Sequence, residues 1–124
     1  MIRTIVCMTA AGVTAVLLSV SASARPEATP VLKGIVGPGF TISLKMNGRR
    51  VRTLKAGRYN FVIADRASSH NFALEQKSGG RFEKNLTGVA FVGRKTVAVR
   101  LKRGKWKFYC APHEATMFGA FTVK

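Results

Sequence analysis

The residue types best suited to chemistry lie near the C-terminus, in the segment Cys110-Ala-Pro-His113-Glu-Ala-Thr-Met117. The spacing Cys-x2-His-x3-Met can close a thiolate, an imidazole and a thioether around one point. His70, forty residues before Cys110, supplies a second imidazole. Two His, one Cys and a weak axial Met form the donor set of a mononuclear copper electron-transfer centre. We therefore predict that His70, Cys110, His113 and Met117 bind one copper ion that cycles between Cu(II) and Cu(I).

Other metal and catalytic chemistries fit the composition less well. A binuclear copper site needs two cysteines in the loop, and only Cys110 is there. Multicopper oxidases need further histidine pairs, whereas the chain has two histidines. Zinc could take the same donors, but structural zinc seldom uses methionine. We recognise no nucleophile–base or carboxylate pair, and Glu114 in the ligand loop is expected to be solvated, so we expect no enzymatic activity.

Short strands must position these donors. Alternating or β-branched runs are separated by Gly, Asn and Asp, which is typical of strands joined by turns. We expect strands at 31–36, 40–45, 51–54, 59–64, 70–75, 96–102, 105–110 and 118–123, with a hairpin turn at Asn47-Gly48. Residues 76–91 predict a long loop with a short strand near 89–91. Seven to eight short strands without a helical stripe indicate an all-β, Greek-key antiparallel β-sandwich.

The alternation also predicts where the donors lie. His70 falls on the apolar face of its expected strand, and so does Cys110 at the end of its own strand, so the two can meet inside the sandwich. His113 and Met117 then come from the loop that follows. Tyr109 alternates to the opposite face, next to Lys105 and Lys107, where we expect a half-exposed ring. The alternative is that Tyr109 is part of an electron-transfer surface, through its covalent link to Cys110.

These motifs resemble the cupredoxins, specifically the small plastocyanin- and amicyanin-like blue copper proteins. The resemblance covers roughly residues 31–124 and rests on the segments 69–72, 108–113 and 117–123. It implies a cupredoxin-like sandwich with His70, Cys110, His113 and Met117 as copper ligands. The loop between His113 and Met117 is one residue shorter than is usual in plastocyanin-like proteins and one longer than in amicyanin-like ones. The resemblance therefore does not set the distance from copper to the Met117 sulfur.

The same resemblance assigns supporting roles to Asn71 and Pro112. The backbone N–H of Asn71 would point at the Cys110 sulfur, and its side chain would join the two ligand loops. Pro112 has no N–H, so the thiolate would accept one hydrogen bond fewer. Fewer hydrogen bonds to sulfur should raise the reduction potential.

Residues 1–24 have the pattern of a secretory signal peptide. Arg3 precedes an apolar core from Ala10 to Val20, and Ala22-Ser23-Ala24 is a small-residue cleavage motif. We expect cleavage before Arg25, a flexible segment at 25–30, a copper-binding domain at 31–124, and a periplasmic or secreted location. An uncleaved membrane anchor is the alternative, although the apolar core is shorter than the ~20 residues of a membrane span. Cys7 would leave with the leader, and metal ligation then explains the remaining exported thiol of Cys110.

The chain is strongly basic, with 21 Lys and Arg against 5 Asp and Glu and a formal charge of +16. Loss of Arg3 with the leader would leave +15. Such a charge accelerates association with acidic partners, so we expect an acidic redox protein as partner or contact with an anionic envelope surface, and a monomer. Export and the lack of a recognisable motif argue against nucleic acid. A periplasmic copper carrier or resistance protein, and a basic cupredoxin-fold binding module, remain the alternative functions.

Overall fold

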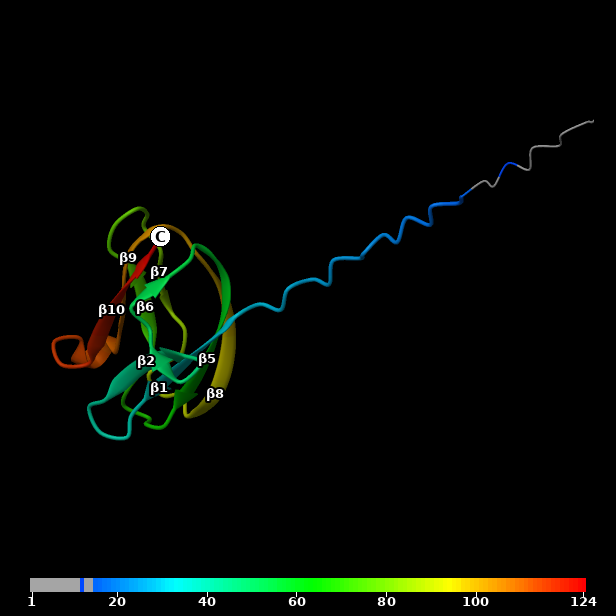
Figure 1. The fold of residues 1–124 in the computed structure, drawn as a ribbon. Coiled ribbons are helices and arrows are strands. Elements are labelled where there is room, and N and C mark those ends of the chain that lie inside the picture. The colour runs from blue at the N-terminus through cyan, green and yellow to red at the C-terminus, as the bar shows by residue number, and fades with distance from the viewer. Residues whose placement is uncertain (1–11, 13–14) are drawn as a thin grey trace, which may run out of the picture.

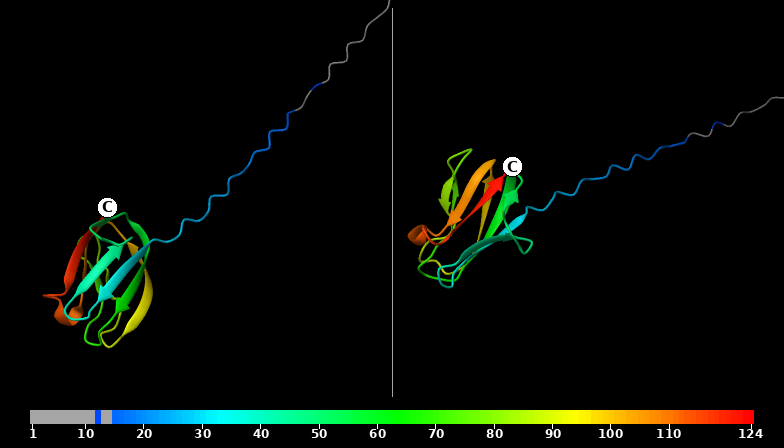
Figure 2. Two further views of the ribbon diagram at one scale, coloured as in Figure 1. Left: turned by 60° about the horizontal axis from the view of Figure 1, so that its bottom comes forward. Right: turned by 60° about the vertical axis from the view of Figure 1, so that its left-hand side comes forward.

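Two five-stranded sheets pack on one core from Val31 onward in the computed structural model (Figure 1), which describes residue 12 and residues 15–124. Most of the expected leader, including Arg3 and Cys7, lies outside the described residues. Residues 15–30 are exposed, have no secondary structure and run away from the sandwich (Figure 2). Within residues 12 and 15–124, no helix is long and apolar enough to cross a membrane.

The first sheet has the strand order β3-β2-β1-β5-β8, and the second has the order β4-β10-β9-β6-β7. The strands of the first sheet are β1 (Val31–Val36), β2 (Ile42–Met46), β3 (Arg49–Arg50), β5 (Gly57–Asp65) and β8 (Gly93–Leu101). Those of the second are β4 (Thr53–Leu54), β6 (Ala73–Gln76), β7 (Glu83–Asn85), β9 (Gly104–Tyr109) and β10 (Phe118–Val123). A short 3₁₀ turn, η1 (Ala111–His113), follows β9.

The alternating sequence explains the main strands. Along β5, Tyr59, Phe61 and Ile63 are buried while the residues between them are partly exposed, as expected for a strand with one face on the core. The hairpin between β2 and β3 turns at Asn47-Gly48, with φ values of 51° and 76°. A two-residue hairpin that needs positive φ at both positions favours Asn-Gly, so the turn prediction is confirmed.

The all-β sandwich is confirmed, but its details differ from the prediction in strand number and direction. The described residues form ten strands rather than seven to eight. The strand expected at 51–54 is shortened to Thr53–Leu54, which pairs with β10 in the second sheet. A separate strand that was not expected, Arg49–Arg50, pairs with β2 in the first sheet. The expected strand at 89–91 is a turn, and the pairing strand is Glu83–Asn85, whose side chains are all exposed and show no alternation.

The sheets are also not wholly antiparallel. Strand β1 pairs with β5 in parallel, and β10 pairs with β4 in parallel. After β3 the chain passes through the second sheet as β4 and then returns to the first sheet as β5. Because of this crossover, β5 runs in the same direction as β1. Side-chain alternation records which face is buried, but it does not record the direction of a partner strand.

An aromatic stack supports the end of the sandwich that holds the predicted ligands. Phe72, two residues after His70, stacks on Phe108, two residues before Cys110, with ring centroids 5.6 Å apart and an interplanar angle of 6°. Gly119 makes room for this stack, because a Cβ there would overlap the Phe108 ring. The core therefore sets where each ligand segment leaves the sandwich.

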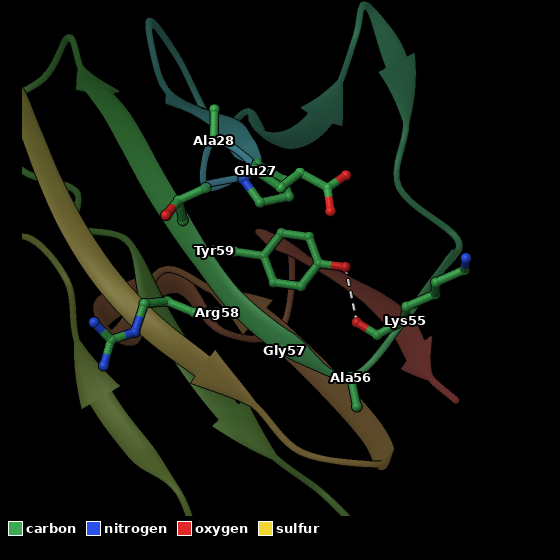
Figure 3. A pocket seen from close by; sticks show the side chains of 9 residues that line it. Glu27, Ala28, Lys55, Ala56, Gly57, Arg58 and Tyr59 are labelled. Atoms are coloured by element: carbon green, nitrogen blue, oxygen red, sulfur yellow. Dashed lines mark hydrogen bonds between the residues drawn. The ribbon is translucent and has the colours of Figure 1, made fainter. Parts of the chain in front are cut away.

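The opposite end of β5 is closed by Tyr59 (Figure 3). Its hydroxyl donates a hydrogen bond of 2.8 Å to the carbonyl of Lys55, and burial raises the pKa of the phenol. A hollow of about 410 Å³ lies between this region and the segment that precedes β1. We interpret Tyr59 as a neutral structural group.

Candidate metal centre

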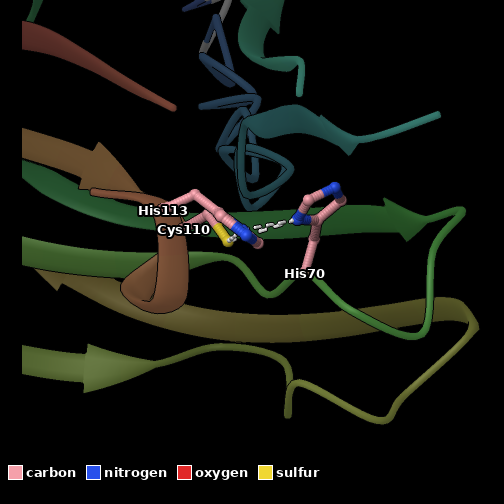
Figure 4. Close-up of side chains that lie close together, drawn as sticks. All are labelled: His70, Cys110 and His113. Atoms are coloured by element: carbon pink, nitrogen blue, oxygen red, sulfur yellow. Dashed lines mark hydrogen bonds between the residues drawn. The ribbon is translucent and has the colours of Figure 1, made fainter. Parts of the chain in front are cut away.

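Three of the four predicted ligands come together at one end of the sandwich (Figure 4). His70 lies in the loop between β5 and β6, Cys110 follows the last residue of β9, and His113 ends η1. Their donor atoms all lie within 4.8 Å of one another. Cys110 and His70 are buried, with exposed fractions of 0% and 4%, whereas His113 is partly exposed.

The spacing of these donors fits a metal ion. Nδ1 of His70 lies 3.0 Å from Nδ1 of His113, and the two nitrogens lie 3.7 and 3.6 Å from Sγ of Cys110. The centre of the triangle that these atoms form is about 2.0 Å from each atom, which matches an ordinary metal–imidazole bond and is about 0.3 Å shorter than a metal–thiolate bond. The cluster therefore has the donors and the spacing of a type 1 copper site.

The loop that carries Cys110, His113 and Met117 is closed by its own backbone. The N–H of Cys110 donates to the carbonyl of Met117 at 3.0 Å, and the N–H groups of His113 and Met117 donate to the carbonyls of Cys110 and His113 at 3.1 and 2.8 Å. This loop joins β9 to β10, which pair from Tyr109 and Phe118 onward. The antiparallel ladder therefore holds the two ends of the loop together without help from a metal.

Met117 occupies the end of this loop and is 1% exposed within the core cluster. Its backbone bond to Cys110 places the two residues side by side, as an axial ligand requires. The assignment of its sulfur as the axial donor stays a prediction. Pro112 lies in η1, where its lack of an N–H removes one potential donor to the Cys110 sulfur.

His70 is held by a loop and not by a strand, because β6 begins only at Ala73. The buried carboxylate of Asp65 accepts hydrogen bonds from the backbone of Ala67 and from the hydroxyl of Thr87, both at 3.2 Å. Thr87 in turn accepts a bond of 2.8 Å from the N–H of Phe72. The loop is thus fixed before and after His70. Burial raises the pKa of the Asp65 carboxyl, and these hydrogen bonds and the charge of His70 oppose that rise.

Asn71 joins the two ligand segments. Its side chain is fully buried, and its Oδ1 accepts a hydrogen bond of 2.7 Å from the backbone N–H of Ala111. Ala111 follows Cys110, so the bond couples the neighbours of two ligands. Among the described residues, the Cys110 sulfur makes polar contacts with the two imidazole nitrogens only. The hydrogen bond that we expected from the backbone N–H of Asn71 to this sulfur is not formed. Within the residues that the structure describes, the Nδ2 atom of Asn71 is buried and has no hydrogen-bond partner.

Phe40 covers both imidazoles and was not expected at the site. Its ring centroid lies 5.4 Å from that of His70 and 5.0 Å from that of His113, both in edge-to-face geometry. The alternation with Ile42 and Leu44 suggested a place in a strand, but β2 begins at Ile42 and Phe40 is 66% exposed. A large aromatic residue directly after Gly37-Pro38-Gly39 was the available signal for a loop position.

Tyr109 is 6% exposed rather than half-exposed. Its hydroxyl donates a hydrogen bond of 2.8 Å to Glu83 on β7, a strand that the sequence did not predict. Burial raises the pKa of the phenol strongly, and the hydrogen bond to Glu83 raises it further. The neighbouring Lys107 lies over the Tyr109 ring and forms an ion pair of 2.8 Å with Glu114. Glu114 is exposed, as expected, with half of its side-chain surface accessible, and it also forms this ion pair.

Comparisons with known proteins identify the fold. No protein-family model and no curated protein matches the chain. A structure of the copper protein rusticyanin aligns over 76% of each chain, with a TM-score of 0.56 and 17% identity. Reduced rusticyanin aligns over 81% of this chain and 82% of its own, with a TM-score of 0.54 and 20% identity. A reduced Cu(I) form of an amicyanin variant scores 0.48 at 15% identity, too low to carry an argument. At these identities the matches show the fold, which is that of the cupredoxins.

Proposed function

We propose that this cupredoxin-fold chain binds one copper ion through His70, Cys110 and His113, with Met117 as a weak axial donor, and carries single electrons. The observation that supports this most directly is the triangle of two imidazole nitrogens and one thiolate, whose centre lies about 2.0 Å from each atom. When bound at such a site, copper supplies a one-electron couple between Cu(II) and Cu(I).

The protein's own contribution is to hold the donors still. The ligand loop is closed by backbone hydrogen bonds, the His70 loop is fixed by Asp65 and Thr87, and Asn71 joins the two segments. Donors that keep one geometry in both oxidation states reduce the reorganisation that accompanies electron transfer. This rigidity supports an electron carrier.

Burial of the donors argues against the alternative of a copper carrier. Such a protein must pass its metal to another, which requires ligands that the acceptor can reach. Here Cys110 and His70 are 0% and 4% exposed, and Phe40 lies against both imidazoles. Ligand exchange at this site should therefore be slow.

The partly exposed ligand, His113, provides the route for electrons to the surface. The side chains of Phe40 and Phe118 are 66% and 55% exposed, and Pro112 beside His113 is exposed as well. We propose that a redox partner docks on this apolar surface. The acidic character of this partner, which the net charge of the chain favours, stays a prediction. Export by cleavage before Arg25 also belongs to the proposal, and mass spectrometry of the N-terminus tests it.

Voltammetry and a chelator competition together test the electron-carrier proposal. The copper-loaded protein should give a reversible one-electron wave and should lose copper to a Cu(I) chelator only slowly. Cys110→Ser should lose the wave. Rapid transfer of copper to the chelator, or an irreversible wave, would instead support a carrier role.

A further inference from the structure

The outward face of the first sheet is basic and carries no acidic side chain. Six exposed residues on β1, β2, β3, β5 and β8 define this basic face: Lys33, Lys45, Arg50, Arg58, Arg94 and Arg100. The one acid on these five strands, Asp65, points into the core and is 2% exposed. Glu75 and Glu83 lie in the second sheet and Glu114 lies in the ligand loop. The two sides of the sandwich therefore differ strongly in charge.

The register of the sheet sets like charges directly opposite one another. Lys33 is paired with Lys45, Lys45 with Arg50, and Arg58 with Arg100. Neighbouring strands are about 4.8 Å apart, and like charges in opposite positions destabilise a sheet. Folding therefore offers no reason for this arrangement. An anionic surface that meets all of these charges at once does.

A shallow groove of about 110 Å³ lies within the same face. Lys33, Arg66 and Arg94 surround it, and Ile35 and Val62 contribute apolar walls. Cations around an apolar depression suit a phosphate group that carries an apolar continuation, such as a phospholipid headgroup. The other four cations of the face spread over four strands in two dimensions, which suits a planar array of anions.

Most of the basic face is also separate from the metal centre. In Figure 1 the ligand loop (orange) and β8 (yellow) lie on opposite sides of the molecule. A redox protein has to approach His113, and the basic face reaches that surface at one edge only, where Lys45 and Arg50 line a hollow with Phe118. Most of the cations therefore serve another contact. We propose that this face docks the protein on an anionic lipid bilayer and leaves the apolar surface around His113 free. The inference does not depend on the metal.

Vesicle binding tests this inference. The full protein, in whatever N-terminally processed form the cells produce, should co-sediment with phosphatidylglycerol-containing vesicles and not with pure phosphatidylcholine vesicles. Each basic residue near an anionic membrane contributes about fivefold to binding, so replacing Lys33, Lys45 and Arg50 together by Gln should weaken partitioning by about 100-fold. Added salt should weaken it further, since screening shortens to ~8 Å at 0.15 M.

A matched triple variant controls for net charge. Lys84→Gln, Lys105→Gln and Lys124→Gln remove the same charge from exposed positions outside the basic face, and we expect them to reduce binding only a few-fold. Equal losses in the two triple variants would overturn the inference. It would also fail if phosphatidylcholine vesicles bound the protein equally well, if inorganic phosphate displaced it, or if soluble polyglutamate bound it more tightly than the bilayer. Unchanged thermal unfolding would show that the variants are folded.

Discussion

The hydrogen bond between Asn71 and Ala111 couples the two ligand segments, and Asn71→Ala should uncouple them. The variant removes the acceptor of the Ala111 N–H, and because this hydrogen bond is only partly buried, the loss falls at the lower end of the about 1–3 kcal/mol of an unpaired buried donor. It also removes Nδ2, which is buried without a partner among the described residues, so part of this loss is recovered. We expect a net loss near 1 kcal/mol, which lowers Tm by roughly 4–8 °C in a domain of this size.

The effect on the metal should exceed the effect on folding. Residues that orient metal ligands through hydrogen bonds typically contribute 10–100-fold to affinity. Asn71→Ala should therefore weaken copper binding by a factor in this range, because the His70 and Cys110 segments can then move independently. Thermal unfolding of the metal-free protein and competitive copper titration measure the two effects separately.

Gln76→Ala is the matched control. Gln76 is also a buried carboxamide, and its Nε2 donates to the carbonyl of Arg103 at 3.1 Å, at the end of β6 remote from the ligands. We expect a similar loss of stability with unchanged copper affinity. If Asn71→Ala leaves the affinity unchanged, or if Gln76→Ala lowers it equally, the coupling argument is wrong.

Three further tests, with five variants, address other parts of the site. Met117→Leu should retain most copper affinity and raise the reduction potential, whereas His70→Ala should largely abolish binding; equal losses in titration would contradict the axial assignment. Phe40→Ala should admit water to both imidazoles and lower the potential measured by voltammetry. Phe118→Ala should leave the potential unchanged, because Phe118 is also exposed (55% against 66% for Phe40) but, among the described residues, forms no ring–ring contact with either imidazole. Asp65→Asn tests the raised carboxyl pKa in the metal-free protein. As pH rises, the Asp65 carboxyl loses its proton at a lower pH in the unfolded chain than in the folded protein. Wild-type stability therefore falls as the pH rises above 3.8, the ordinary pKa of this carboxyl. In denaturant melts, the stability of Asp65→Asn relative to wild type should increase as the pH rises above this value. A difference in stability that does not change with pH would refute the raised pKa.

The ligand loop was predictable because its information is local. Cys110, His113 and Met117 lie within one short segment, and an antiparallel ladder of alternating strands brings its ends together. His70 was predictable as a ligand from its chemistry, but its loop position was not. Its placement depends on Asp65 and Thr87, which lie far apart in sequence.

Features that depend on partner strands were missed. Tyr109 is buried because Glu83 on an exposed, non-alternating edge strand accepts its hydrogen bond. Phe40 lies on the imidazoles because β2 begins two residues later than the alternation suggests. The basic face arises from the cross-strand register, which places cations from five strands together. Each of these follows from pairings between distant segments, which periodicity along one segment does not record.

The most direct test of the account is the visible absorption spectrum during titration with Cu(II). A thiolate and two imidazoles around one copper should give an intense thiolate-to-copper charge-transfer band that saturates at one copper per chain. Cys110→Ser should lose the band, because it removes the sulfur. A protein that binds one equivalent of Cu(II) and stays colourless, or a band that survives in Cys110→Ser, would contradict the proposed centre.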